Sequence, residues 1–137
     1  MTETTSKTTG WSIILWAAQL LLAAAYGLFG SMKATQPLDQ LAKMMTWIPS
    51  FPPLFVRSLG VVEVLGAIGL ILPSLTRIQP RLTVIAALCI LVHQFLAVSL
   101  HVSKGEISVL GLNVVLIMLA AFIFWGRRRK AVILPRA

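Results

Sequence analysis

The sequence predicts an all-α membrane protein, an antiparallel bundle of four transmembrane helices. Hydrophobic residues make up 58% of the 137 residues and charged residues only 12%, whereas a soluble domain carries about 25% charged residues. The mean hydropathy of +0.89 agrees with this contrast. Four apolar runs, about 11–30, 54–75, 82–100 and 107–125, each have the roughly 20 residues that a helix needs to cross a bilayer. We therefore expect one membrane domain over residues 1–137.

The first run, 11–30, is expected to be a retained span. Its apolar stretch is longer than the roughly 7–15 residues of a signal peptide. The charges of Glu3 and Lys7 cancel in its N-terminal flank, where a signal peptide would be positive. Three alanines at 23–25 resemble the small residues of a cleavage site, so a signal peptide is the alternative.

The segment at about 37–48 is expected to form a short amphipathic helix on the membrane interface between spans one and two. Apolar side chains recur in it at helical spacing, at Leu38, Leu41, Met44, Met45 and Ile48. Trp47 suits the headgroup belt. Two roles stay open for this segment: a lid packed over the bundle, or a gate through which an amphiphilic ligand enters.

The remaining links are short, so consecutive spans are expected to pack as antiparallel neighbours. Pro73 is expected to end span two and Pro80 to begin span three. Gly105 offers a turn or a helix cap between spans three and four.

Basic residues are unevenly divided between the two ends of the predicted bundle. One end would carry eight, namely Lys7, Arg77, Arg81 and the five in the basic tail 126–137, and the other end four. The positive-inside rule therefore places both termini in the cytoplasm, and we expect a multi-pass protein of the inner membrane. The tail would anchor the last span and attract anionic lipid headgroups; docking of a protein partner is the alternative. Because the charges flank spans, the net charge of +8 does not indicate nucleic-acid binding.

Glu63 is the most informative residue, since it lies in the middle of the second apolar run. An acidic side chain at that depth costs roughly 2.5–3.5 kcal/mol, and such residues usually face the bundle interior and mark a site. Gly60, Gly66 and Ala67 lie three or four residues from it. These small residues allow a neighbouring helix to approach closely, so this face should point inward.

Polar residues on the other spans come to similar depths. Counting about 1.5 Å per residue, Glu63 lies about 14 Å, His93 about 11 Å and Asn113 about 9 Å below the outer surface. Gln94 adjoins His93, Gln19 comes to about 16 Å, and Tyr26 is shallower. We therefore expect a polar pocket in the outer half of the membrane.

Further charged groups are expected around this pocket. Arg57 lies two turns outward from Glu63 and is long enough to lean back toward it. His101 shares a stripe with Gln94, seven residues earlier. Lys33 and Lys104 would form a cationic mouth at the outer surface.

Several interpretations of the Glu63 site stay open. A pair with Arg57 or His93 would serve only to fix helix register. Alternatively, Glu63 and His93 are catalytic residues in general acid–base or quinone-type chemistry, because a carboxyl group in a low-dielectric interior can hold a proton near neutral pH. A third interpretation is that the site binds an amphiphilic ligand without catalysis. The histidines lack the close spacing of a metal site, so none is expected. Cys89 is the single cysteine, which argues against dithiol chemistry.

The order of these residues resembles the DoxX-like family of small four-helix membrane proteins. The resemblance is carried by residues 30–33 (Gly-Ser-Met-Lys), by residues 57–66 (Arg-x-x-Gly-x-x-Glu-x-x-Gly), by Leu-Pro at 72–73, and by His-x-x-x-Gly at 101–105, followed by the basic tail. It places the characteristic polar positions of the family at Lys33, Arg57, Glu63 and His101. His93, Gln94 and Asn113 come from the depth count instead.

The resemblance implies a range of functions. Members of the family are linked to thiosulfate:quinone oxidoreduction, to redox-stress complexes with soluble enzymes, and to assembly of other membrane proteins. We therefore expect an accessory or quinone-linked membrane subunit with a Glu/His pocket. A non-catalytic assembly factor, chaperone or scaffold is the alternative. A quinone is the one cofactor considered, since no haem, iron–sulfur or dithiol motif is present. The expected partners are the bilayer, a membrane protein or a second copy, and an amphiphilic small molecule.

Overall fold

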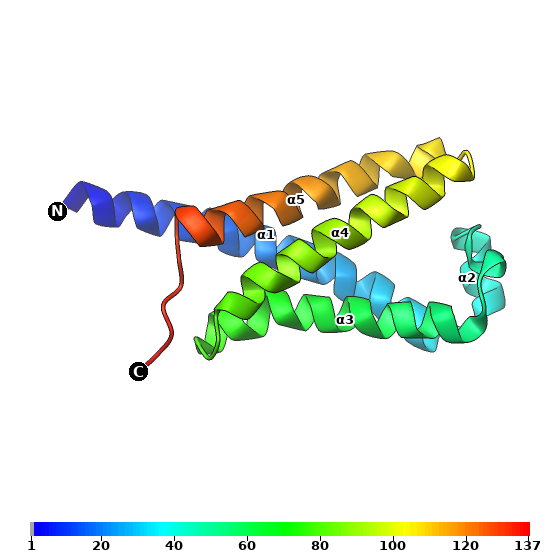
Figure 1. Ribbon diagram of the computed structural model, residues 1–137, viewed down its shortest axis with the longest axis horizontal. Helices are drawn as coiled ribbons and strands as arrows, with labels where there is room; N and C mark the ends of the chain where they lie inside the picture. Colours follow the sequence, from blue (N-terminus) through cyan, green and yellow to red (C-terminus); the bar gives the residue numbers. More distant parts are fainter. Residues whose placement is uncertain (1) are drawn as a thin grey trace.

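The computed structural model describes residues 2–137, and side chains from residue 8 onward, so the side chains of Glu3 and Lys7 lie outside the described residues. It confirms the all-α class and the four-span bundle (Figure 1). Within residues 2–137, four helices are long and apolar enough to cross a membrane. They are α1 (Thr2–Thr35), α3 (Pro53–Thr76), α4 (Arg81–Ser103) and α5 (Leu110–Arg129), the last preceded by a short 3-10 turn, η2 (Ile107–Val109).

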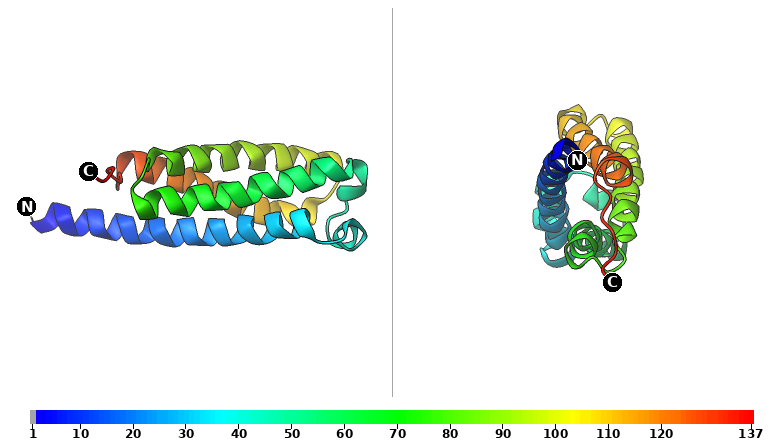
Figure 2. Two further views of the ribbon diagram at one scale, coloured as in Figure 1. Left: turned by 90° about the horizontal axis from the view of Figure 1, so that it is seen from below. Right: turned by 90° about the vertical axis from the view of Figure 1, so that its left-hand side faces the viewer.

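The four helices form a ring in which α1 contacts α3, α3 contacts α4, α4 contacts α5, and α5 contacts α1. Both chain termini lie at one end, which we call the terminal end (Figures 1 and 2). The α1–α3 pair and the α4–α5 pair spread apart toward the opposite end (Figure 1). We call this the lid end, because the link between α1 and α3 lies across it.

The lid is the short helix α2 (Leu38–Met44) with the 3-10 turn η1 (Ile48–Ser50), which confirms the helix expected between the first two spans. Leu41, Trp47 and Ile48 are buried and pack with Val56 in a separate apolar cluster. Trp47, expected in the headgroup belt, is therefore part of the protein interior. Because Leu41, Trp47 and Ile48 of the lid pack inward, the lid folds down onto the bundle.

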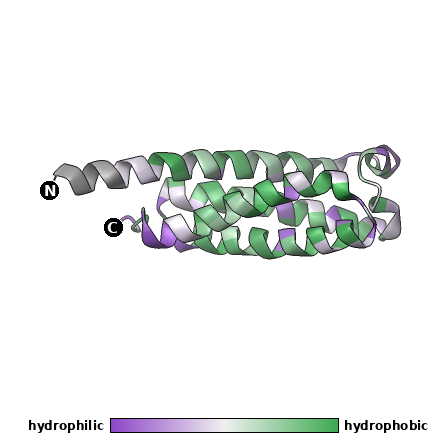
Figure 3. Cartoon of the chain, turned by 90° about the horizontal axis from the view of Figure 1, so that it is seen from above, coloured by the Kyte–Doolittle hydropathy of each residue, from purple (hydrophilic) through white to green (hydrophobic). Residues whose placement is uncertain are grey.

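Each spanning helix buries a narrow stripe and exposes the rest. On α3 the buried residues include Val56, Gly60, Glu63, Ala67 and Leu70, at the three- and four-residue spacing of one helix face. The outward faces carry large apolar side chains, many about half exposed (Figure 3). Such surfaces contact lipid in a multi-pass membrane protein.

Two glycines bring α1 and α3 into backbone contact. A Cβ atom added at Gly60 would lie 2.6 Å from both the nitrogen of Ala34 and the carbonyl oxygen of Gly30. A Cβ added at Gly30 would lie 2.8 Å from the Gly60 oxygen. Only glycine allows this approach, which sets the end of α1 against the middle of α3.

The link between α3 and α4 differs from the expectation at one residue. Pro73 does not end the helix, which continues for one more turn to Thr76. A proline is tolerated in a spanning helix where neighbours satisfy the backbone. The helix ends instead at Arg77, whose φ of 58° is in the left-handed region, a common way to terminate a helix. Pro80 begins α4, as predicted.

Candidate functional site

A cavity of about 580 Å³ lies between the helix pairs at the lid end. Ligand pockets commonly have about 300–1,000 Å³. All four spanning helices and the lid contribute to its wall, which is mostly apolar. Of the residues predicted for the site, the cavity is lined by Lys33, Glu63, His93, Gln94, His101 and Asn113.

Glu63 is paired with Lys33. The Lys33 ammonium donates to both carboxylate oxygens, at 2.7 and 2.8 Å, and the two residues are only 7% and 5% exposed. The close α1–α3 contact at Gly30 and Gly60 places Lys33 over the carboxylate. A buried ion pair with two hydrogen bonds offsets much of the cost of removing two charges from water.

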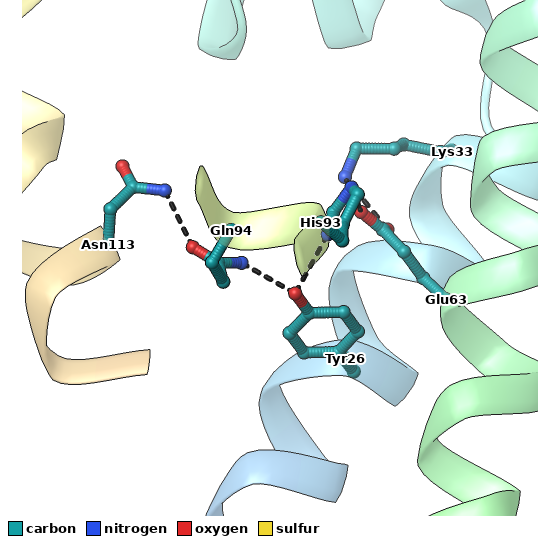
Figure 4. Close-up of polar contacts among 6 residues, drawn as sticks. All are labelled: Tyr26, Lys33, Glu63, His93, Gln94 and Asn113. Carbon is teal, nitrogen blue, oxygen red and sulfur yellow. Dashed lines mark hydrogen bonds and ion pairs between the residues drawn. The ribbon is translucent and has the colours of Figure 1, made fainter. Parts of the chain in front are cut away.

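A chain of polar side chains continues from this pair across the bundle (Figure 4). His93 Nε2 lies 3.6 Å from Glu63 Oε1, and His93 Nδ1 lies 2.8 Å from the Tyr26 hydroxyl. Gln94 donates to the same hydroxyl at 2.6 Å. Asn113 donates to Gln94 Oε1 at 2.8 Å. The chain therefore includes residues of α1, α3, α4 and α5, and we call it the lid-end network.

The hydrogen bonds of this network run in one direction. Because the Tyr26 oxygen accepts from Gln94, its own proton is free to be donated to His93 Nδ1. A neutral His93 then carries its proton on Nε2, the atom that faces Glu63. The donors of the chain thus point from Asn113 toward His93 Nε2, which faces Glu63. The His93–Glu63 separation of 3.6 Å is longer than a hydrogen bond.

This arrangement is suited to proton exchange with a bound polar group. Glu63 accepts from Lys33 on one side and faces the imidazole of His93 on the other. A ligand oxygen near His93 Nε2 would receive a hydrogen bond from it, and a proton given up there could be replaced at Nδ1 from the Tyr26 hydroxyl. The Lys33–Glu63 pair is neutral overall, so an uncharged head group would meet no net charge there.

Aromatic and sulfur-containing side chains form the wall beside the lid. Phe51 stacks on Phe55 with ring centroids 4.9 Å apart, and Trp47 meets Phe51 edge-on at 5.8 Å. The Lys33 ammonium lies 5.8 Å from the Trp47 ring. Met44 also lines this wall, and methionine adapts to ligands of irregular shape. The cavity thus has a polar floor and an apolar upper wall.

His101 lines the cavity but is not part of the lid-end network. Its Nδ1 is 2.6 Å from Glu106, in the turn that follows α4. The neighbouring Lys104 reaches the lid, where it donates to the Ser50 hydroxyl at 2.7 Å. His101 therefore lines the cavity, and its imidazole bonds to the turn that follows α4.

The prediction that Arg57 leans toward Glu63 is wrong. Its guanidinium donates instead to the carbonyl oxygen of Lys33 at 2.8 Å, and Arg57 does not line the cavity. Six residues of α-helix correspond to a rotation of about 240° at about 100° per residue, so Arg57 and Glu63 point from different faces of α3. Arg57 satisfies a carbonyl at the C-terminal end of α1, which has no partner within that helix.

Two other expectations change. Lys33 was assigned to a surface mouth, but it is buried against Glu63 because α1 continues to Thr35. Tyr26 was noted only for its depth, yet its hydroxyl connects His93 with Gln94. Its helical spacing indicated this position, since Tyr26 and Lys33 are seven residues apart and share a face of α1.

A second polar chain lies near the terminal end and also includes residues of all four spanning helices. We call it the terminal-end belt. Arg127 donates to Gln19 at 2.6 Å, Gln19 donates to the Leu70 carbonyl at 2.5 Å, and Ser74 bonds Thr83 at 2.8 Å. Gln19 is thus separate from the pocket. Arg127, expected among headgroups, is only 3% exposed, and its guanidinium lies 5.4 Å from the Trp16 ring.

Other ligand-forming groups are dispersed. Among the residues that the structure describes, no three His, Cys, Asp or Glu side chains lie close enough to hold a metal ion. Cys89 is exposed on the outer face of α4.

A comparison with family models finds a match to the model described as the DoxX-like family, over residues 17–123. This range covers more than half of the chain and includes every residue of the lid-end network. No curated protein and no solved structure matches the chain.

Proposed function

Because the chain belongs to the DoxX-like family, we propose that it is an accessory or quinone-linked membrane subunit whose lid-end cavity binds the polar head of an amphiphilic small molecule. The observation that carries the proposal is the Lys33–Glu63 ion pair with His93 beside it, in a cavity whose wall is mostly apolar. Ionisable groups inside a spanning bundle are costly and usually functional.

The residues that line the cavity support the binding of an amphiphile with one polar end. The head group would contact His93 and the Lys33–Glu63 pair, and the tail would lie against the aromatic wall of Phe51 and Phe55. A quinone fits this description, since its carbonyl oxygens accept hydrogen bonds and its ring stacks on aromatic side chains. Reduction to the quinol would take two electrons from an electron donor in a larger complex and two protons, for which His93 and the Lys33 ammonium are the donors in the cavity.

We further propose that the lid end faces outward and that the termini are cytoplasmic, in the inner membrane. Six exposed basic residues lie at the terminal end and two, Lys43 and Lys104, at the lid end. The positive-inside rule favours the cytoplasm for the terminal end. The ligand would then enter from the outer leaflet or from outside the cell.

The alternative function is that of an assembly factor, chaperone or scaffold. It is favoured by the apolar outward faces, for example Val114, Val115 and Met118 on α5, which are 52–66% exposed. Another membrane protein or a second copy of the chain would pack there. Photo-crosslinkers at these positions would then capture a membrane protein in native membranes, and replacement of Glu63 would not matter.

The proposal is tested by extracting the protein from native membranes and identifying co-purifying amphiphiles by mass spectrometry. The double variant Lys33→Met/Glu63→Gln removes both charges, whereas either single variant leaves one buried charge unpaired and is destabilised by it. The matched control is Asp39→Asn, which removes an exposed carboxylate on the lid that does not line the cavity. We expect an amphiphile with the wild type and the control, and at least tenfold less with the double variant. Equal amounts in all three proteins, or none in any, would contradict the pocket.

A further inference from the structure

The terminal end carries a concentrated and unpaired positive charge. Six exposed basic residues come from three segments, namely the α3–α4 link, the end of α5 and the C-terminal tail. They are Arg77, Arg81, Arg128, Arg129, Lys130 and Arg136, and we call them the terminal-end patch. In the part of the chain with described side chains, the ion pairs involve none of these six. Cations without a carboxylate partner attract anions at the membrane surface.

The C-terminal tail draws these segments together. After α5 ends at Arg129, the tail crosses the terminal end to the α3–α4 link (Figures 1 and 2). The backbone nitrogen of Arg136 donates to the Arg77 carbonyl at 3.1 Å, and Arg77 Nε donates to the Leu134 carbonyl at 2.9 Å. Two residues 59 positions apart in the sequence are thereby held side by side.

Apolar side chains lie between the cations. On the tail, Val132 is 58% and Leu134 is 67% exposed; on the link side, Leu75 is 66% and Ile78 is 54% exposed. Exposed apolar and basic residues in one surface are typical of a segment that lies in the headgroup region of a membrane. Lys130 is 5.6 Å from the Trp11 ring and 5.5 Å from the Trp125 ring, and tryptophans prefer that same depth.

We propose that the terminal-end patch is a binding site for anionic phospholipid, with phosphate groups held between the α5 end and the strapped tail. Guanidinium groups bind phosphate through paired hydrogen bonds, and Arg77 has donors beyond the one used by Leu134. The apolar residues of the tail enter the acyl boundary while the arginines face the headgroups. The sequence alone indicates a general attraction by the basic run, whereas the fold assigns Arg77 and Arg136 to one site.

The occupant is a lipid rather than a nucleic acid or a soluble acidic protein. The patch adjoins four spanning helices, so a bilayer is always present beside it. Half-exposed leucine and valine side chains among the cations gain from acyl chains and gain nothing from a polar polyanion. This site does not depend on the lid-end cavity, which lies at the opposite end of the bundle.

The test is native mass spectrometry of the purified protein, titrated with phosphatidylglycerol or with phosphatidylcholine of the same acyl chains. The variant is Arg77→Gln/Arg136→Gln, and the control is Lys43→Gln/Lys104→Gln, which removes two exposed charges at the lid end. One basic residue near an anionic surface contributes about fivefold in affinity, equivalent to about 1 kcal/mol. We expect about 25-fold weaker binding of phosphatidylglycerol in the variant, and no more than a twofold change in the control.

A second variant separates the tail from the α5 end. Truncation after Val132 removes Arg136 but keeps Arg127 with its acceptor, the Ala131 carbonyl, and we expect it to weaken phosphatidylglycerol binding by at least fivefold. Equal binding of both lipids would overturn the proposal, as would an equal loss in the control or unchanged binding after truncation. Displacement of the lipid by millimolar inorganic phosphate would also overturn it, since the site would then be one for free phosphate.

Discussion

Removing Lys33 while keeping Glu63 should strongly destabilise the protein. In Lys33→Met, a side chain of similar length keeps the packing near Gly60, but the Glu63 carboxylate loses both hydrogen bonds from the ammonium. Glu63 is only 5% exposed, so water replaces them incompletely. Breaking one half of a buried ion pair costs about 3–5 kcal/mol. We expect the lower part of this range, about 3 kcal/mol, because the pair borders a cavity that water can enter.

The double variant Lys33→Met/Glu63→Gln provides the comparison. It leaves no unpaired charge, and replacing a buried ion pair by neutral residues is often close to neutral. We expect its free energy of unfolding to lie within about 1 kcal/mol of the wild type. The two substitutions would then show a coupling of about 2 kcal/mol or more.

The assay is equilibrium unfolding in mixed micelles with increasing sodium dodecyl sulfate, followed by tryptophan fluorescence. Lys104→Met serves as the control, because Lys104 is exposed and bonds only the Ser50 hydroxyl; it should change stability by no more than about 0.5 kcal/mol. If Lys33→Met is as stable as the wild type, Glu63 has another partner and the ion pair is not what holds it. If the double variant is as unstable as the single one, the loss comes from packing rather than charge.

Three further substitutions test the packing and the hydrogen bonds, each by the same unfolding assay. Gly60→Ala should cost about 1–3 kcal/mol, because the new methyl meets the α1 backbone; Gly111→Ala, with nothing within 4 Å, is the control and should not destabilise. Tyr26→Phe removes the hydroxyl between His93 and Gln94 and should cost about 1–3 kcal/mol; no loss would mean that the network is not formed. Gln19→Leu leaves the buried Arg127 Nε without its acceptor and should cost about 1–3 kcal/mol, and an unchanged stability would contradict the terminal-end belt.

The spans could be predicted because their signal is local. A run of about 20 apolar residues has one stable form in a bilayer, so composition and length were enough. The lid helix was also predictable, since Leu38 and Leu41 follow the spacing of one helix face. The inward face of α3 followed from the small residues Gly60 and Ala67 beside Glu63.

The partner of Glu63 was not predictable from the sequence. Lys33 is 30 residues away, and at the end of an apolar run it has the appearance of an interfacial residue. Its position depends on how far α1 continues and on the close crossing at Gly30 and Gly60, which no local pattern specifies. The distance along the helix suggested Arg57 as a partner of Glu63. Its side chain points in another direction, however, and contacts the carbonyl oxygen of Lys33 instead.

Arg127 shows how a charge run conceals a buried residue. Four basic residues in a row suggest a uniformly exposed segment, yet the helical repeat continues through them. Ala120, Ile123 and Arg127 lie on one face of α5, and all three are buried. If the buried stripe of α5 is extended into the basic run, Arg127 is the basic residue that falls on it and faces the bundle interior.

The most direct test of the account is binding of a short-chain benzoquinone to a protein in which Trp47 is the single tryptophan. Trp47 lines the cavity, and the other tryptophans, at positions 11, 16 and 125, are replaced by phenylalanine. A quinone in the cavity quenches Trp47 fluorescence. We predict saturable quenching, with an affinity at least tenfold weaker after Lys33→Met/Glu63→Gln. Quenching that rises linearly and equally in both proteins would reflect partition into the membrane alone and would contradict a Glu63-centred binding pocket.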